Sequence, residues 1–269
     1  MTVRVDRETR IAIRVWDLPV RLMHWTLVAC ILVLSVTGVY LAHPFLSPAQ
    51  SPGGPATGFT MGTIRAVHIT AGWVFTDVLI ARVGWALVGN RWARWDQIVP
   101  VHRERRALLR PSLDYYLFRR LDAPPVIGHN PLAGATYLVL FGMFAVQAFT
   151  GFALEALVNP HGVMWAATGW IFVAIPVPYV RVAHYLIMWL TWGFVIHHVY
   201  SAWLVDREER SGELSSIVTG WKNLPSSRVA SAPELRPHGE RPANRPAWVA
   251  RGLARAKLAW AQLARRRAR

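Results

Sequence analysis

Cysteine is almost absent from this chain of 269 residues, which contains only Cys30. A single thiol excludes an intrachain disulfide and a metal cluster held by several thiolates. Cys30 lies among apolar residues, where a free cysteine behaves as a small hydrophobic side chain. The chemistry of this protein therefore has to come from other residue types.

Acidic residues are scarce as well, because 15 Asp and Glu stand against 30 Lys and Arg, for a formal net charge of +15. Such an excess often marks a nucleic-acid-binding protein. However, 53% of the residues are hydrophobic, whereas soluble domains average about 45 to 50%. The distribution of the charges along the chain resolves this conflict.

Four stretches nearly free of charge are long enough to cross a bilayer as helices, which takes about 20 residues. They cover, approximately, residues 20–42, 64–89, 132–157 and 180–205. A fifth apolar run, at 165–175, is too short to span and predicts an interfacial or re-entrant segment. The first run is too long for the core of a signal peptide, so it predicts a retained helix. The sequence thus predicts an all-α integral membrane protein, a bundle of four transmembrane helices.

Basic residues alternate between the segments that flank these stretches. Lys and Arg number five in residues 1–23, one in 43–66, eight in 90–131, one in 158–182 and fourteen from residue 206 onward. Because cytoplasmic segments are enriched in Lys and Arg, this pattern predicts a multi-pass protein of the cytoplasmic (inner) membrane with both termini in the cytoplasm. The positive charge then reports topology, and no nucleic-acid partner is expected.

Four histidines fall at two matched depths of the predicted bundle. His24 and His198 lie near the cytoplasmic ends of the first and fourth spans, and His68 and His184 near the outer ends of the second and fourth. The 14 residues from His184 to His198 turn a helix by about 1400°, so the two share a face. His197 lies about 140° away from that face.

Two histidines from facing helices at one depth are the axial ligands of a six-coordinate haem iron, which has no free position for a substrate. The sequence therefore predicts two b haems, one for the pair His68 and His184 and one for the pair His24 and His198. The expected activity is electron transfer. A metal transporter is the alternative from another class, although zinc or copper needs ligands that converge on one point.

Arginines accompany these histidines. In "VRLMHW", "IRAVHI" and "VRVAHY" an Arg precedes the His by three residues, on the same helix face. Guanidinium binds carboxylate in a bidentate manner, so Arg21 is expected to bind a propionate of the inner haem, and Arg65 and Arg181 those of the outer haem. Arg82, at the inner depth of the second span, is also expected at the inner haem. Snorkelling to the membrane surface is the alternative for all four.

Glycines lie at the expected haem depths. Gly38 faces the outer site from the first span, and Gly72 lies one turn from His68. Glycine lets backbones approach closely in membrane bundles, and a flat macrocycle would use the same space. The segment "TGFAL" at 150–154 echoes "TGVYL" at 37–41, which favours a two-helix repeat. Ordinary packing of small residues is the alternative for the glycines of the third span.

Six segments carry a family resemblance: "VWDLPVRLMHW", "FTMGTIRAVHITAGWVF", "WALVGNR", "YYLF", "GHNPLA" and "TGFAL". They resemble the b-type cytochrome subunit of membrane-bound nickel–iron hydrogenases, in the bacterial di-haem cytochrome b group that includes formate dehydrogenase gamma subunits. The resemblance covers about residues 13–222. "GHNPLA" and the pattern "MGTIRxxH" are typical of the hydrogenase branch. The resemblance implies the same four haem ligands in the same pairs.

The resemblance also implies a function. By this resemblance the chain is the membrane anchor and electron-transfer subunit of a respiratory uptake hydrogenase. Its small and large partner subunits would oxidise hydrogen at the periplasmic face, and electrons would pass through both haems to quinone. The resemblance implies a quinone site at Asn130, for which a helix cap is the alternative. Formate dehydrogenase, thiosulfate reductase and a stand-alone quinol-oxidising cytochrome b remain alternative settings.

The chain from 223 to 269 departs from this pattern. It is basic and Pro-rich and ends in "AWVARGLARAKLAWAQLARRRAR", in which apolar residues fall on one helical stripe between Arg and Lys. We expect residues 1–222 to form the di-haem domain. The tail is expected to end in a cationic amphipathic helix on the inner leaflet, and a disordered basic tail is the alternative.

Overall fold

Four long helices dominate the computed structural model, which describes residues 9–45, 60–117, 119–120, 124 and 126–232. They are α1 (Leu18–Ala42), α2 (Thr60–Val88), α6 (Pro131–Ala156) and α9 (Val177–Glu209). Each is long and apolar enough to cross a membrane. They correspond to the four predicted spans, and α9 extends beyond its predicted span at both ends.

Capping residues and prolines set the starts of these helices. Asp17 precedes α1, and its side chain accepts a hydrogen bond from the Val20 N–H at 3.4 Å. Pro19 in α1 and Pro178 in α9 occupy the first turn, and α6 begins at Pro131. Proline fits there because the first amides of a helix have no intrahelical acceptor.

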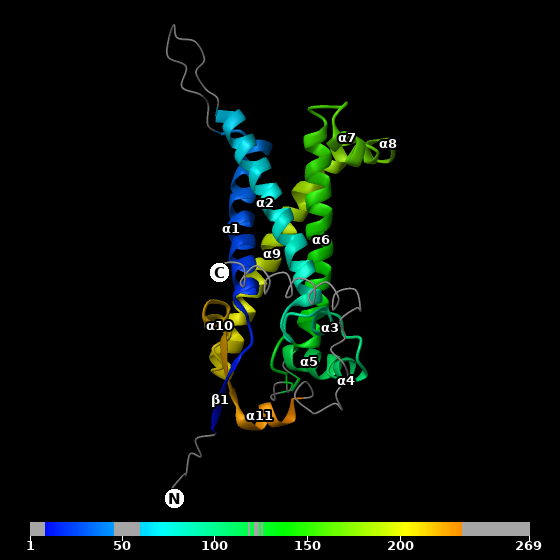
Figure 1. Ribbon diagram of the computed structural model, residues 1–269. Coiled ribbons are helices and arrows are strands. Elements are labelled where there is room, and N and C mark those ends of the chain that lie inside the picture. The colour runs from blue at the N-terminus through cyan, green and yellow to red at the C-terminus, as the bar shows by residue number, and fades with distance from the viewer. Residues whose placement is uncertain (1–8, 46–59, 118, 121–123, 125, 233–269) are drawn as a thin grey trace, which may run out of the picture. The chain divides into compact units, whose positions relative to one another are not determined.

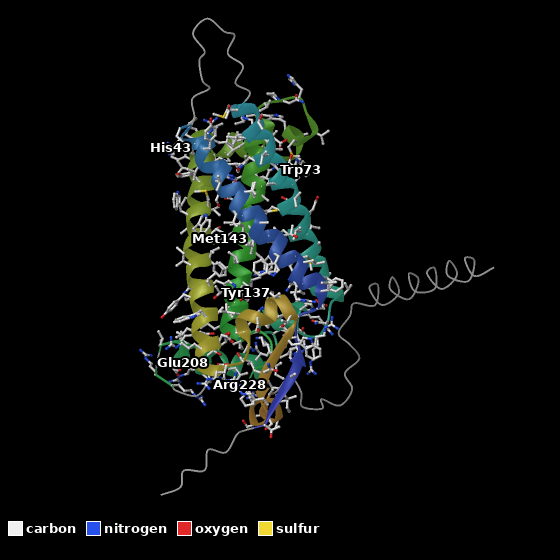
Figure 2. All side chains as sticks on the ribbon, turned by 90° about the vertical axis from the view of Figure 1, so that its left-hand side faces the viewer. His43, Trp73, Tyr137, Met143, Glu208 and Arg228 are labelled. Atoms are coloured by element: carbon white, nitrogen blue, oxygen red, sulfur yellow. The ribbon has the colours of Figure 1, made fainter. Side chains whose placement is uncertain are left out.

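The chain folds as two compact units. The bundle unit comprises residues 12–82 and 135–223 and contains α1, α9 and most of α2 and α6. Its long helices run alongside one another (Figures 1 and 2). The loop unit comprises the described parts of 1–11, 83–134 and 224–269.

Apolar side chains hold the bundle unit together. Cys30 of α1, Phe75 of α2 and Phe144 of α6 are buried in one cluster, and the rings of Phe75 and Phe144 meet edge to face with centroids 5.1 Å apart. The outward sides of the helices are apolar too, since Val36 is 69% and Ile196 is 68% exposed. A helix that is hydrophobic all round suits a membrane span.

The fifth apolar run forms two short helices, α7 (Val163–Thr168) and α8 (Ile171–Ala174). Neither is long enough to span a bilayer. Ile171 is buried against Ala153 of α6 and Val180 of α9, whereas Val173 is 92% exposed. The run is therefore anchored to the bundle unit through one face of a short helix.

A small sheet departs from the all-α prediction. Strand β1 (Arg10–Arg14) pairs with strand β2 (Trp221–Pro225). The alternation of Arg and Ile in "RIAIR" has the two-residue period of a strand. The expected domain boundary after residue 222 lies inside β2, which is followed by α11 (Ser226–Ser231). The predicted amphipathic helix lies outside the described residues.

The end of the bundle unit after α9 is tied by polar contacts around α10 (Glu213–Thr219). Lys222 forms an ion pair with Glu213 at 2.7 Å, and the indole N–H of Trp16 donates to Ser216 Oγ at 3.1 Å. Gly220 has φ +91°, and a Cβ there would lie 2.6 Å from the Trp16 carbonyl oxygen. Only glycine fits this turn, which brings the segment after α10 beside the residues that precede α1.

Arg105 organises the loop unit, which contains α3 (Trp95–Ile98), α4 (Arg103–Ala107) and α5 (Leu109–Tyr116). Arg105 as a whole is 4% exposed. It donates to Gln97 Oε1 at 2.8 Å, to the Gln97 carbonyl at 2.7 Å and to the His129 carbonyl at 2.8 Å. These bonds connect α3 and α4 with the segment that leads into α6.

Candidate haem-binding site

The structure brings the four predicted histidines together as two pairs within the bundle unit. The ring centroids of His68 on α2 and His184 on α9 lie 6.5 Å apart, and those of His24 on α1 and His198 on α9 also lie 6.5 Å apart. These are the pairings expected from depth. His197 is exposed, and its Nε2 lies 3.4 Å from Ser201 Oγ on the same helix.

The two pairs lie towards opposite ends of the long helices. The ring of His43, at the end of α1, packs against Tyr185 beside His184, with centroids 6.1 Å apart. The ring of Tyr137 on α6 packs against His198, with centroids 6.3 Å apart. Figure 2 shows His43 and Tyr137 towards opposite ends of the bundle unit. The pairs therefore form two separate sites.

The spacing within each pair fits one iron ion between the rings. An imidazole nitrogen binds a first-row metal ion at about 2 Å, so two imidazoles on opposite sides of one ion have centroids about 6 Å apart. Within the described ranges no group of three or more His, Cys, Asp or Glu is arranged to hold a metal ion. Two protein ligands suit a haem iron, because the macrocycle supplies the other four.

Two threonine hydroxyls contact the His68–His184 pair. Thr37 Oγ1 of α1 lies 2.8 Å from His68 Nδ1, and Thr150 Oγ1 of α6 lies 2.9 Å from His184 Nδ1. With Nδ1 engaged in both rings, Nε2 is the nitrogen left to bind iron. The Gln147 amide nitrogen lies 3.3 Å from His184 Nε2, so this side chain has to turn aside when iron binds there.

A glycine follows each threonine and leaves room for the ring. A Cβ at Gly38 would lie 3.4 Å from His68 Cε1, and a Cβ at Gly151 would lie 3.1 Å from His184 Cε1. The second distance is shorter than an ordinary van der Waals contact, so only glycine fits beside His184 without a shift. A Cβ at Gly72 would meet nothing within 4 Å, which leaves open space beside α2.

Aromatic rings surround the His24–His198 pair. Phe194 stacks on His198 with centroids 5.5 Å apart and an interplanar angle of 10°. Trp25 meets the ring of His24 edge-on at 5.3 Å. In the described part of the chain the buried Nδ1 of His24 has no hydrogen-bond partner. His24 thus differs from His68 and His184 in what surrounds its Nδ1 atom.

The predicted arginines lie in different surroundings. Arg82 is buried, and its guanidinium lies 6.0 Å from the centroid of the Phe141 ring. A buried cation inside a membrane-length helix marks a functional position. Arg21 donates to the backbone carbonyl of Val218, near the end of α10, which uses one of its five N–H donors. The other two are exposed: Arg65 and Arg181.

Asn130 lies in the loop unit and caps α6. Its Oδ1 accepts a hydrogen bond from the Ala133 N–H at 2.7 Å, and its Nδ2 donates to the Tyr116 hydroxyl at 2.9 Å. The first bond is the helix cap that the sequence left open as an alternative. The second joins the start of α6 to α5, so the amide contacts a phenol as well as the backbone.

Neither Thr37 nor Thr150 is among the residues predicted from the sequence, and for Gly151 ordinary packing is the alternative. The repeated "TG" in "TGVYL" and "TGFAL" is the pattern that pointed to them. The role of this repeat is visible only in the three-dimensional structure, where the threonine and the glycine of each copy lie beside a histidine of another helix. The repeat relates α1 with α2 to α6 with α9.

Paired histidines between membrane-length helices define a class of protein, the membrane-bound cytochromes b. The model of the prokaryotic cytochrome b561 family matches residues 15–220, and the chain belongs to this family. It is therefore a multi-pass membrane cytochrome of mostly helical fold that transfers electrons with haem b.

Relatives with assigned names agree with this family. "Probable Ni/Fe-hydrogenase 1 B-type cytochrome subunit" of Escherichia coli (strain K12) is 34% identical over 223 residues, covering 81% of this chain and 93% of the relative. "Probable Ni/Fe-hydrogenase B-type cytochrome subunit" of Azotobacter chroococcum mcd 1 is 36% identical over 233 residues, covering 84% and 93%. The protein of that name in Cupriavidus necator is 34% identical over 215 residues, covering 78% and 86%. These similarities confirm the resemblance seen in the motifs.

Proposed function

We propose that this chain is the membrane anchor and electron-transfer subunit of a respiratory uptake nickel–iron hydrogenase, and that it passes electrons from the periplasmic small subunit to ubiquinone or menaquinone. Bound haem b at each histidine pair supplies a one-electron relay. The observation that carries the proposal is the pair of bis-histidine sites, each with centroids 6.5 Å apart. The names of the relatives support a hydrogenase made of small and large subunits as the partner.

The histidines do more than hold the cofactors. A haem held by both histidines of a pair would have no coordination position free for a substrate. The chain is therefore restricted to electron transfer, and hydrogen oxidation takes place on the partner subunits.

The orientation of the chain follows from its basic residues. Residues 90–131 contain eight Lys and Arg, and the segment from residue 206 onward contains fourteen, so both are placed in the cytoplasm. The His68–His184 pair then lies near the periplasmic surface of the cytoplasmic membrane, within reach of the hydrogenase. The His24–His198 pair lies near the cytoplasmic surface, where electrons leave.

Four arginines and two glycines complete the proposed cofactor sites. The guanidinium groups bind the propionates, and the glycines face the macrocycles. The buried Arg82, 6.0 Å from the Phe141 ring centroid, is the member of this set most enclosed by protein. The set consists of Arg21, Arg65, Arg82, Arg181, Gly38 and Gly72.

We place the quinone site at Asn130. Reduction of a quinone needs protons as well as electrons, so the protein has to supply polar groups beside it. Asn130 Nδ2 and the Tyr116 hydroxyl already form a hydrogen bond of 2.9 Å, and both atoms are groups that a quinone carbonyl recognises. Protons are then taken up from the cytoplasm while hydrogen oxidation releases protons outside.

The terminal tail has a separate proposed role. We propose residues 1–222 as the di-haem domain and residues 223–269 as a basic extension that binds the anionic inner leaflet. The 11 Lys and Arg from residue 223 onward supply the attraction to acidic lipid.

Purification of the chain with its partners tests the proposed function. We expect the nickel–iron hydrogenase subunits to copurify, the pyridine haemochrome assay to give two haem b per polypeptide, and hydrogen to reduce both haems. One haem, or none with bound zinc, would contradict the two sites. A copurifying molybdopterin enzyme would move the chain to the formate dehydrogenase or thiosulfate reductase setting.

A further inference from the structure

The hydroxyls of Thr37 and Thr150 are positioned to accept hydrogen bonds from histidine. Thr37 Oγ1 lies 2.6 Å from the Val33 carbonyl oxygen, and Thr150 Oγ1 lies 2.8 Å from the Val146 carbonyl oxygen. A hydroxyl has one proton, and a carbonyl oxygen can only accept it. Each hydroxyl therefore donates to the preceding turn of its own helix, which leaves its oxygen as an acceptor.

The histidine facing each hydroxyl must then carry its proton on Nδ1. Thr37 lies 2.8 Å from Nδ1 of His68, and Thr150 lies 2.9 Å from Nδ1 of His184. A neutral imidazole with Nδ1–H has its lone pair on Nε2. The backbone of α1 and α6, acting through one hydroxyl each, thus selects the tautomer whose Nε2 can bind a metal.

The contact of Gln147 with His184 is compatible with this tautomer. The Gln147 amide nitrogen lies 3.3 Å from His184 Nε2, and an amide nitrogen donates, so Nε2 is the acceptor with the amide in this orientation.

We propose that Thr37 and Thr150 are positioning residues that hold His68 and His184 with Nε2 towards the iron and lower the reduction potential of the haem bound between them. The proposal rests on the proposed function for the presence of haem at this pair. An acceptor on Nδ1–H makes the imidazole a stronger electron donor through Nε2. Stronger donation favours ferric over ferrous iron, and hydrogen bonding around the ligands is a known control of haem potential.

The two histidine pairs differ in this respect, which gives electron flow a direction. Among the described residues His24 Nδ1 has no hydrogen-bond partner, so this ligand of the His24–His198 pair lacks the same donation. A haem held by the His68–His184 pair, with an acceptor on both ligands, would then have the lower potential. It would pass one electron downhill to a haem held by the His24–His198 pair, with no bond or proton exchanged.

Valine variants of the two threonines test the proposal in the purified complex. Valine has nearly the shape of threonine but lacks the hydroxyl, so Thr37→Val and Thr150→Val should keep two haems per polypeptide. A redox titration should show a higher midpoint potential for the His68–His184 haem and an unchanged potential for the other. Because the two hydroxyls act on ligands of the same iron, the double variant should show the larger shift. Loss of the other haem in His198→Ala identifies which potential belongs to which pair.

Serine variants and a matched control separate this role from packing. Thr37→Ser and Thr150→Ser keep the hydroxyl and should restore the original potential and the electron paramagnetic resonance spectrum of the ferric haem. Thr191 of α9 is also buried, and its hydroxyl donates to the Ile187 carbonyl at 2.8 Å. Thr191→Val should leave both potentials unchanged.

The results that would overturn the role of the threonines differ from those that would overturn the proposed function. Unchanged potentials in valine variants that retain both haems would overturn it, and so would equal shifts of both haems. If the valine variants lose a haem, the serine variants decide, because haem loss in them too would mean that packing rather than the hydroxyl matters. Failure of the proposed function appears instead in the unmodified protein, as a missing haem or as haems that hydrogen does not reduce.

Discussion

Two adjacent histidines of identical chemistry have different surroundings because a helix turns by about 100° per residue. His198 faces His24 with ring centroids 6.5 Å apart and stacks on Phe194. His197 is exposed and lies beside Ser201. At the scale of the residue, orientation rather than residue type selects the candidate ligand.

Replacement of each histidine tests this selection. His198→Ala should lower the haem content from two to one per polypeptide, because the His24–His198 iron loses an axial ligand. His197→Ala should keep both haems. Pyridine haemochrome assay of the purified proteins measures the difference, and haem loss in His197→Ala alone would show that α9 is not a regular helix at this point.

Asn130 combines a helix cap with a candidate quinone contact, and two variants separate these roles. Asn130→Ala removes both and costs about 1 kcal/mol of helix stability through the lost cap. Asn130→Asp keeps a capping oxygen for the Ala133 N–H but removes the amide that donates to Tyr116. Both variants should slow hydrogen-dependent quinone reduction while hydrogen still reduces both haems.

The aspartate variant decides between the roles of Asn130. Normal quinone reduction in Asn130→Asp with slowed reduction in Asn130→Ala would assign Asn130 to the cap alone. Normal rates in both variants would place the quinone site elsewhere.

At the scale of the element, α9 is the helix that both candidate sites share. It contributes His184 to one pair and His198 to the other, whereas the partners come from α2 and α1. The register of α9 between these histidines therefore couples the two sites. The 14-residue spacing keeps both imidazoles on one face of the helix.

Insertion of two alanines after Gly193 tests this coupling. The insertion rotates the following part of α9 by about 200° and advances it by about 3 Å, so Ile196 takes the place of His198 and neither His197 nor His198 faces His24. The His24–His198 haem should be lost and the His68–His184 haem retained, as measured by haem content and redox titration. Gly193→Ala is the matched control, because a Cβ there meets nothing within 4 Å. Retention of both haems after the insertion would show that His198 is not a ligand.

At the scale of the whole molecule, hydrophobicity and charge indicate different things, the spans and their orientation. The four apolar helices supply the spans, and the alternating Lys and Arg counts are the basis of the proposed orientation. If both termini lie in the cytoplasm, as we propose, the His68–His184 pair is the one that a periplasmic enzyme can reach. The proposed direction of electron flow depends on this orientation.

Reporter fusions test the orientation. Green fluorescent protein should fluoresce when fused after Val99 or Ala232, because both points are expected in the cytoplasm. Alkaline phosphatase should be active when fused after Phe45 or His161, because both are expected in the periplasm. The opposite pattern would reverse the chain in the membrane and place the His24–His198 pair on the side of the hydrogenase.

The spans and the phase of the histidines could be predicted from the sequence because they are local properties. Hydrophobicity adds up along a segment regardless of what the segment contacts, and the angle between His184 and His198 follows from helix geometry alone. The pairing of His24 with His198 and of His68 with His184 required only the alternation of span directions. The strand β1 escaped prediction because a five-residue alternation becomes a strand only when β2, some 200 residues away, pairs with it.

Only the tertiary structure decided which groups surround each histidine. Thr37 and His68 lie 31 positions apart, and Thr150 and His184 lie 34 apart, so their contacts depend on how α1 packs on α2 and α6 on α9. The same packing set the 3.1 Å between a Cβ at Gly151 and the His184 ring. Helical periodicity tells which face a residue occupies, but the rotation and separation of neighbouring helices arise from the packing of all their side chains. For that reason the sequence determined the candidate ligands, and the tertiary structure determined the hydrogen bonds that distinguish one pair from the other.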